Sequence, residues 1–273
     1  MDGFAAAPNP SDPRFRRFIG RGELSGNRAG PARRNHDSTC PPLLGRVVIA
    51  SLYLGRHGRA WTDAELAEAH ESLLRAAVWL ESQAQRYRAA VNLELLDLDF
   101  VTDDDGPDEI AISFESQGDE VGPIEEDATT KALFRATRAA ARLGFRDAPE
   151  LFQTVEDRLR ADVNVWLLQL REAGRSFAVP RDEHAPGGIS LAVCYPREAS
   201  FPEPLTGPAR VDPVTVVHEL LHLFGASDKY GRSLKTYPPG AVTHREVMRL
   251  SEERLSRVRI DPATAAEIGW LVG

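Results

Sequence analysis

The sequence predicts an α+β fold in which helices cover a mixed β-sheet. Residues 46–54 form a near-continuous apolar run of strand length, and residues 91–100 alternate apolar and polar side chains as a half-buried strand does. Between them, Thr62 and Glu65 make a capping box, after which apolar residues recur at helical spacing as far as Tyr87. A strand, a long helix and a second strand in this order predict a sheet with helices packed on it.

Further elements follow along the chain. Helices are expected at residues 131–143 and after Asp147, which forms a second cap with Glu150. Strands are expected at residues 164–169, 176–179 and 187–195.

Residues 212–224 predict a helix that is buried on all sides. Asp212 supplies an N-cap oxygen, Pro213 has the fixed φ of a first helical position, and Gly225 is a natural stop. Apolar side chains between these residues surround the helix, which is typical of a buried helix rather than a surface one.

Three polar side chains interrupt this apolar helix: His218, Glu219 and His222. Burying them without partners would cost several kcal/mol, so a partner is expected. Because His218 and His222 lie four positions apart, both rings project from one helix face and can bind one metal ion, with Glu219 beside them. The alternative is two core histidines that hydrogen bonds satisfy.

A catalytic zinc ion takes three protein ligands and leaves its fourth position to water. Asp228 lies six residues beyond His222, and a continuing helix would carry it about 9 Å along the axis, away from the metal. A turn at Gly225 would bring it back. Asp228 is therefore the expected third ligand.

The full string His218-Glu219-x-x-His222-x-x-Gly225-x-x-Asp228 resembles the metzincin clan of metallopeptidases. It matches the version with aspartate as third ligand, which snapalysin-type enzymes show. The resemblance implies one catalytic Zn²⁺ ion bound by the two histidines and the aspartate. Glu219 is then the general base and not a ligand.

The resemblance also implies a methionine turn under the metal and a closing helix. Met248 lies twenty residues past Asp228 and is the only methionine after Met1. On its own it would be interpreted as a gap-filling core residue. Residues 260–270 predict the closing helix, with Asp261 as its N-cap.

On this resemblance the expected fold is zincin-like: a mixed twisted sheet with helices and an antiparallel edge strand, the buried zinc helix, and a small irregular C-terminal lobe. Residues 1–43 are expected to be a disordered, arginine-rich tail. Residues 44–273 are the expected catalytic domain, with an upper lobe over 44–224 and a lower lobe over 225–273. The metal lies in the cleft between the lobes.

By the same resemblance, the strand just before the zinc helix lines the cleft as an antiparallel edge strand and pairs with an extended peptide. This substrate strand is expected to consist of Ile189, Ser190, Leu191, Ala192, Val193 and Cys194. The alternative is a paired interior strand that binds no ligand.

The implied mechanism is hydrolysis of a peptide bond by a metal-activated water. Zinc lowers the pKa of its water toward about 7 and polarises the scissile carbonyl. Glu219 takes the proton of the water and delivers it to the leaving amine. Tyr230 and Tyr237 are candidates by position for stabilising the tetrahedral oxyanion, against the alternative of packing or surface tyrosines.

Other residues compete for places at the metal. His244 is an alternative third ligand, in which case Asp228 would orient a histidine. A gluzincin-like arrangement would use Glu246 or Glu252 instead. Cys40 could occupy the position of the water and hold the enzyme latent, although its surroundings do not match the switch motif of matrixin relatives.

Composition excludes several classes of protein. The net charge of −8 argues against nucleic acid as the main partner, and no apolar stretch is long enough to span a bilayer. The N-terminus lacks the pattern of a secretion signal, and two cysteines are too few for a disulfide framework. These features predict a cytoplasmic protein, whereas most metzincins are secreted.

Residues 103–127 contain eleven acids and no Lys or Arg. A solvated acidic insertion is expected there, because a calcium loop of the EF-hand type would place Val101 and Ile112 at positions that require acids.

Three functions are compatible with these features. The first is a zinc endopeptidase whose partner is an extended peptide or protein substrate. The second is a zinc hydrolase that cleaves an amide in a non-protein substrate. The third is a catalytically silent, metal-stabilised interaction module, which usually lacks the general base that Glu219 supplies here.

Overall fold

The computed structural model describes residues 15–19, 40–55, 60–102, 122–172, 174–180, 190–196, 211–231, 233–250 and 254–271. Its strands are β1 Phe15–Ile19, β2 Gly45–Leu54, β3 Val91–Thr102, β4 Val163–Leu170, β5 Phe177–Val179 and β6 Leu191–Cys194. Its α-helices are α1 Asp63–Arg86, α2 Gly122–Arg142, α3 Ala148–Leu159, α4 Pro213–His222 and α5 Pro262–Glu267. Short 3₁₀ helices lie at η2 Ser233–Thr236, η3 Val247–Arg249 and η4 Leu255–Arg257.

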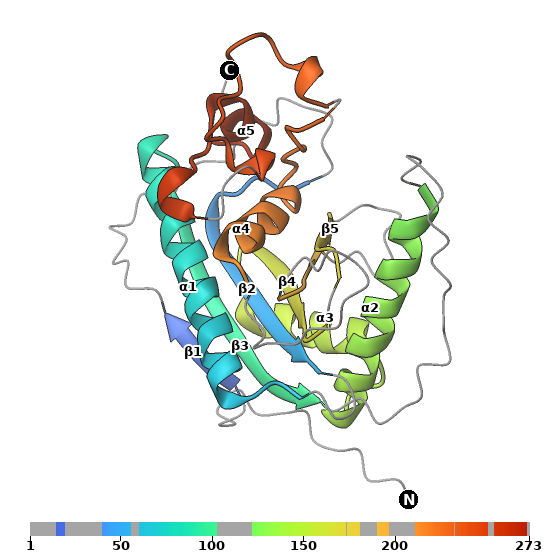
Figure 1. Cartoon of the computed structure of the whole chain (residues 1–273). Helices are drawn as coiled ribbons and strands as arrows, with labels where there is room; N and C mark the ends of the chain where they lie inside the picture. Colours follow the sequence, from blue (N-terminus) through green and yellow to red (C-terminus); the bar gives the residue numbers. More distant parts are fainter. Residues whose placement is uncertain are drawn as a thin grey trace, which may run out of the picture.

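The strands form one six-stranded mixed sheet in the order β1-β3-β2-β4-β6-β5 (Figure 1). The four central strands are parallel to one another, whereas β1 and β5 run antiparallel to their neighbours at the two edges. The predicted α+β class with a mixed sheet is therefore confirmed.

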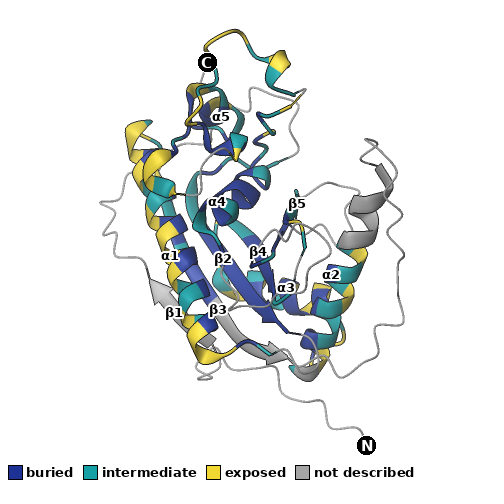
Figure 2. Cartoon of the chain, in the orientation of Figure 1, coloured by how far each residue is buried: buried dark blue, intermediate teal, exposed yellow. Residues whose placement is uncertain are grey.

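Helices cover both faces of this sheet, and β2 shows how the sequence specifies the two layers. Val47 and Ile49 pack in the core beneath α1 and α4, and Val48 and Ala50 pack in the core beneath α2 and α3. All four side chains are buried, so the strand is apolar on both faces (Figure 2). This explains the near-continuous apolar run, which is typical of a central parallel strand.

The start of α1 is fixed as its sequence predicts. The Thr62 hydroxyl accepts a hydrogen bond from the Glu65 N–H at 3.3 Å, and the Glu65 carboxylate accepts one from the Thr62 N–H at 2.9 Å. Arg171, just past the end of β4, donates two further hydrogen bonds to this carboxylate, each of 2.9 Å. Glu65 is 4% exposed, so this ion pair ties the start of α1 to the end of β4 within the core.

The expectation that residues 189–194 form an edge strand is wrong. β6 pairs in parallel with β4 on one side and antiparallel with β5 on the other, so it lies inside the sheet. The edge strand on this side of the sheet is β5, which the sequence indicates as a strand but does not place in the sheet. Ser190 and all of β6 are buried, and Ile189 lies outside the described residues.

The segment expected to be a tail contributes to the fold at two places. Phe15–Ile19 forms β1 and pairs with β3. Leu43 is buried, its N–H donates to the Ile268 carbonyl at 3.0 Å, and its own carbonyl accepts the indole N–H of Trp270 at 2.8 Å. The folded region thus begins before residue 44. Residues 1–14 and 20–39, like residues 103–121 of the acidic stretch, lie outside the described part of the chain.

Residues after Gly225 form only short elements, which pack on the C-terminal half of α1 (Figure 1). Trp79 donates its indole N–H to the Leu255 carbonyl at 3.0 Å, and Tyr87 donates its hydroxyl to the Ile260 carbonyl at 2.7 Å. Asp261 stands at the N-cap position of α5, but its carboxylate makes no capping bond there and instead accepts from the Thr243 N–H.

Candidate metal centre

α4 is held in the core as its sequence predicts. The Asp212 carboxylate accepts from the Val214 N–H at 3.2 Å, and Pro213 is the first helical residue. The helix stops at Gly225, whose φ of 92° is the left-handed conformation that glycine adopts without steric cost. Two hydrogen bonds, from Gly225 N–H to the His222 carbonyl and from Ala226 N–H to the Leu221 carbonyl, make the Schellman helix end that reverses the chain.

This reversal brings Asp228 back to the two histidines. The Nε2 atoms of His218 and His222 lie 3.1 Å apart, and Asp228 Oδ1 lies 3.2 Å and 3.3 Å from them. Ligand atoms about 2.0–2.1 Å from a tetrahedral zinc ion are themselves about 3.3 Å apart. The triangle therefore has the dimensions of three vertices of a zinc site.

The hydrogen bonds around these atoms indicate that they are arranged to bind a cation rather than to bond to one another. Asp228 Oδ1 is a buried oxygen without a hydrogen bond, even though both imidazole nitrogens are close to it. His222 Nδ1 lies 2.7 Å from the Ala226 carbonyl. Because a carbonyl only accepts, Nδ1 carries the proton and Nε2 presents its lone pair to the centre of the triangle.

Burial and mutual charge interactions shift the pKa values of all three side chains. Burial lowers the pKa of His218, which leaves its imidazole neutral. Burial acts in the same direction on His222, but the Asp228 carboxylate beside it prevails and raises that pKa. For Asp228, burial is outweighed by the two imidazoles, which hold the pKa of the carboxyl well below its usual range. Within the described residues, these three side chains are the group that can hold a metal ion.

Glu219 lies next to this group without belonging to it. Glu219 is 5% exposed. Burial chiefly raises the pKa of the Cys194 thiol of β6, and the Asp228 carboxylate chiefly raises that of His222; the charge of Glu219 adds to both shifts. Glu219 thus follows His218 directly on the buried helix α4.

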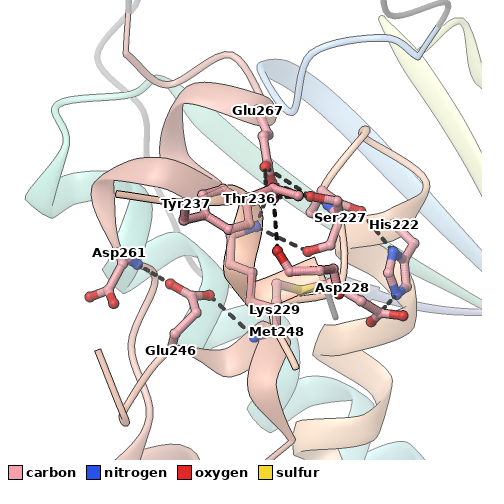
Figure 3. A network of polar contacts seen from close by, with 12 residues as sticks. His222, Ser227, Asp228, Lys229, Thr236, Tyr237, Glu246, Met248, Asp261 and Glu267 are labelled. Atoms are coloured by element: carbon pink, nitrogen blue, oxygen red, sulfur yellow. Dashed lines mark hydrogen bonds and ion pairs between the residues drawn. The ribbon is translucent and has the colours of Figure 1, made fainter. Parts of the chain in front are cut away.

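The two tyrosine candidates occupy different places. The Tyr230 ring stacks on the His218 ring with a centroid distance of 6.4 Å, and burial together with the Asp228 charge raises the pKa of Tyr230 to about 12. Its phenol keeps its proton at neutral pH. The Tyr237 hydroxyl instead donates to Glu267 at 2.5 Å and contacts Ser227 Oγ at 2.5 Å (Figure 3). Only Tyr230 is brought to the group.

Met248 lies directly behind the loop that carries Asp228. It is fully buried in η3, and its carbonyl accepts the N–H of Lys229 at 3.0 Å. Met248 and the ligand loop are thus joined by a backbone hydrogen bond, and the role of Met248 as a methionine turn stays a prediction.

The competing ligands that lie in the described part of the chain do not join the group. His244 is exposed, and Glu246 is buried but accepts from the backbone N–H groups of Met248 and Asp261, at 3.2 Å and 2.6 Å. Glu252 lies outside the described residues. Cys40 is half-buried and does not belong to the metal-binding group among the described residues.

Sequence reasoning missed the residues that surround the ligand loop. Lys229 is fully buried, and its ammonium group pairs with the Glu267 carboxylate of α5 at 2.6 Å (Figure 3). The two residues are 38 positions apart, and no local spacing rule connects them. The one available signal is the position of a lysine directly beside a candidate ligand.

No protein-family model matches the chain, and neither does any curated protein. The function therefore has to be inferred from the metal centre and its surroundings.

The third ligand can be identified by metal content. Asp228→Ala removes the only oxygen of the triangle, so the purified variant should lose most of its zinc after dialysis that leaves wild-type protein near stoichiometric. His244→Ala, which changes an exposed imidazole in the same lobe, should keep its zinc. Elemental analysis of the three proteins checks this, and zinc retained by Asp228→Ala at the wild-type level would show that the third ligand lies elsewhere.

Glu246 predicts a pH dependence of stability. Burial raises its pKa from an ordinary 4.5 to about 7 in the folded protein. The folded state then binds more protons than the unfolded state between these values, so its stability falls as pH rises through this window, by up to about 3 kcal/mol.

Urea unfolding of metal-free wild type and Glu246→Gln at several pH values tests this. The free energy of unfolding of the wild type should fall relative to that of the variant between pH 4.5 and about 7. Parallel pH profiles would mean that Glu246 does not titrate in this range.

Proposed function

We propose that the chain is a metzincin-like zinc endopeptidase. The observation that carries this proposal is the orphaned, buried Asp228 Oδ1, which faces two imidazole Nε2 atoms at 3.2 Å and 3.3 Å with Glu219 buried beside them. A hydrolytic zinc site has three protein ligands and, next to them, a carboxylate that does not bind the metal but can act as a base. A purely structural zinc site has four protein ligands.

The sheet supports a substrate that binds as an extended chain. β5 is an antiparallel edge strand that contacts α4 (Figure 1). It would take the cleft-lining role that the resemblance assigned to residues 189–194. One side of β5 pairs with β6, and no other described strand pairs with it. Its outer backbone groups can therefore pair with a peptide next to the metal helix.

The residues divide the work of hydrolysis as follows. His218, His222 and Asp228 would hold the zinc ion. Bound zinc supplies Lewis acidity and acidifies the water that it holds. Glu219 accepts the proton of the attacking water and delivers it to the leaving amine, so that the carboxylate is restored after each turnover. Tyr230, whose ring stacks on His218, would donate a hydrogen bond to the developing oxyanion.

The general base is tested by Glu219→Gln, which keeps the size of the side chain but does not accept a proton. Cleavage of unfolded proteins and fluorogenic peptides should fall by a factor of about 100 to 10,000, the usual contribution of a positioned base, while zinc content stays at the wild-type level.

Glu71→Gln is the matched control, because Glu71 is an exposed carboxylate on α1 paired only with Arg75 in the described contacts. It should cleave at the wild-type rate. Wild-type activity in Glu219→Gln would show that Glu219 is not the general base. A zinc-loaded wild type that cleaves neither kind of substrate would contradict the proposal of an endopeptidase.

A further inference from the structure

We infer that Glu267, on the last turn of α5, is a positioning residue that fixes the third zinc ligand by clamping both of its chain neighbours, Ser227 and Lys229. The inference rests on the zinc site of the proposed function. Glu267 lies outside the zinc-binding string, which ends at Asp228.

The Glu267 carboxylate accepts four hydrogen bonds. Oε2 accepts from the Ser227 N–H at 3.1 Å and from the Lys229 ammonium group at 2.6 Å. Oε1 accepts from the Ser227 hydroxyl at 2.9 Å and from the Tyr237 hydroxyl at 2.5 Å. Three of the four donors belong to the two residues that flank Asp228, so one carboxylate holds the ligand loop on both sides of the ligand (Figure 3).

Lys229 makes the clamp rigid. Its side chain is fully buried, and its ammonium group also donates to the Ser227 carbonyl at 3.0 Å and lies 5.0 Å from the centroid of the Tyr237 ring. A buried ammonium ion without a counter-charge costs several kcal/mol, so the position of this side chain depends on Glu267. The Lys229 N–H is bonded to Met248, which fixes the backbone as well.

The clamp acts where the ligand itself is least constrained. Residues 226–229 have no regular secondary structure, and the Asp228 side chain is 37% exposed, whereas His218 is held in a buried helix with 2% exposure. The position of Oδ1 relative to the two imidazoles therefore depends on the anchors at residues 227 and 229. Outer partners that orient metal ligands typically change metal affinity by about 10- to 100-fold.

The location of Glu267 is not explained by the stability of α5. A carboxylate at the C-terminal end of a helix is disfavoured by the partial negative charge of the helix dipole, and the last turn of α5 has no basic residue. The contacts that offset this cost all lead to the ligand loop or to Tyr237, which stacks against the same lysine.

The zinc dissociation constant measures the effect directly. We compare wild type, Glu267→Gln and Glu65→Gln by competition with a chromogenic chelator, with folding checked by circular dichroism. Glu65 is the matched control, because it is also a carboxylate paired with a cation, but it lies in the first turn of α1, whereas the segment after Gly225 packs on the C-terminal half of that helix. Zinc should bind about 10- to 100-fold more weakly to Glu267→Gln and within twofold of wild type to Glu65→Gln.

Glu267→Gln leaves the Lys229 charge buried and could weaken folding, so a second variant separates folding from positioning. Lys229→Met combined with Glu267→Gln removes both charges and leaves an uncharged pair of similar size, so that no buried charge lacks a partner. This double variant should fold as wild type does and still bind zinc about 10- to 100-fold more weakly, with an altered visible absorption spectrum of the cobalt-substituted protein.

The outcomes distinguish the two claims. Wild-type protein that binds no zinc would overturn the proposed function and the positioning role together. Wild-type zinc affinity in the double variant would overturn the positioning role alone. An equal loss of affinity in Glu65→Gln would show that general destabilisation, and not the clamp, sets the zinc affinity.

Discussion

The convergence of three atoms that can bind a metal ion on one point within the protein is the constraint on which the rest of the structure depends. Two imidazole nitrogens and an ionised carboxylate oxygen lie 3.1–3.3 Å apart, and the oxygen has no hydrogen bond. Such a group is unfavourable in a buried environment unless a cation compensates it. The buried α4 prevents the His218 ring from turning to solvent, and the Gly225 turn brings the carboxylate to it.

The sheet with its helices and the irregular segment after Gly225 both contribute to this centre, and α1 contacts both. The sheet and α1 form the apolar wall against which α4 is buried. The C-terminal half of α1 then binds the irregular segment after Gly225 through Trp79 and Tyr87. That segment supplies Asp228 together with Met248 and Glu267 behind it. A ligand from an irregular loop can be placed accurately in this way, because the loop is bonded to helices on two sides.

The sequence predicted the elements well where the determinants are local. The capping box of Thr62 and Glu65, the N-cap of α4 and the turn at Gly225 each depend on residues within one or two helical turns. Their spacing therefore indicates the geometry.

The sequence did not predict what depends on pairing across the chain. A period of two identifies a strand but not its neighbours, so β6 was expected at the edge that β5 occupies. The Glu267 clamp joins residues about 40 positions apart, and Asp261 turns from its helix to Thr243, 18 positions away. Such contacts are set by how the irregular segment packs on α1, which propensity and periodicity do not encode.

The most direct test of the metal centre is a crystal structure of the zinc-loaded protein with anomalous diffraction data on both sides of the zinc absorption edge. We predict one strong anomalous peak within about 2.0–2.2 Å of His218 Nε2, His222 Nε2 and Asp228 Oδ1, with Glu219 beside it and outside ligand distance. A peak bound by other side chains, or no peak between the two imidazoles, would contradict it.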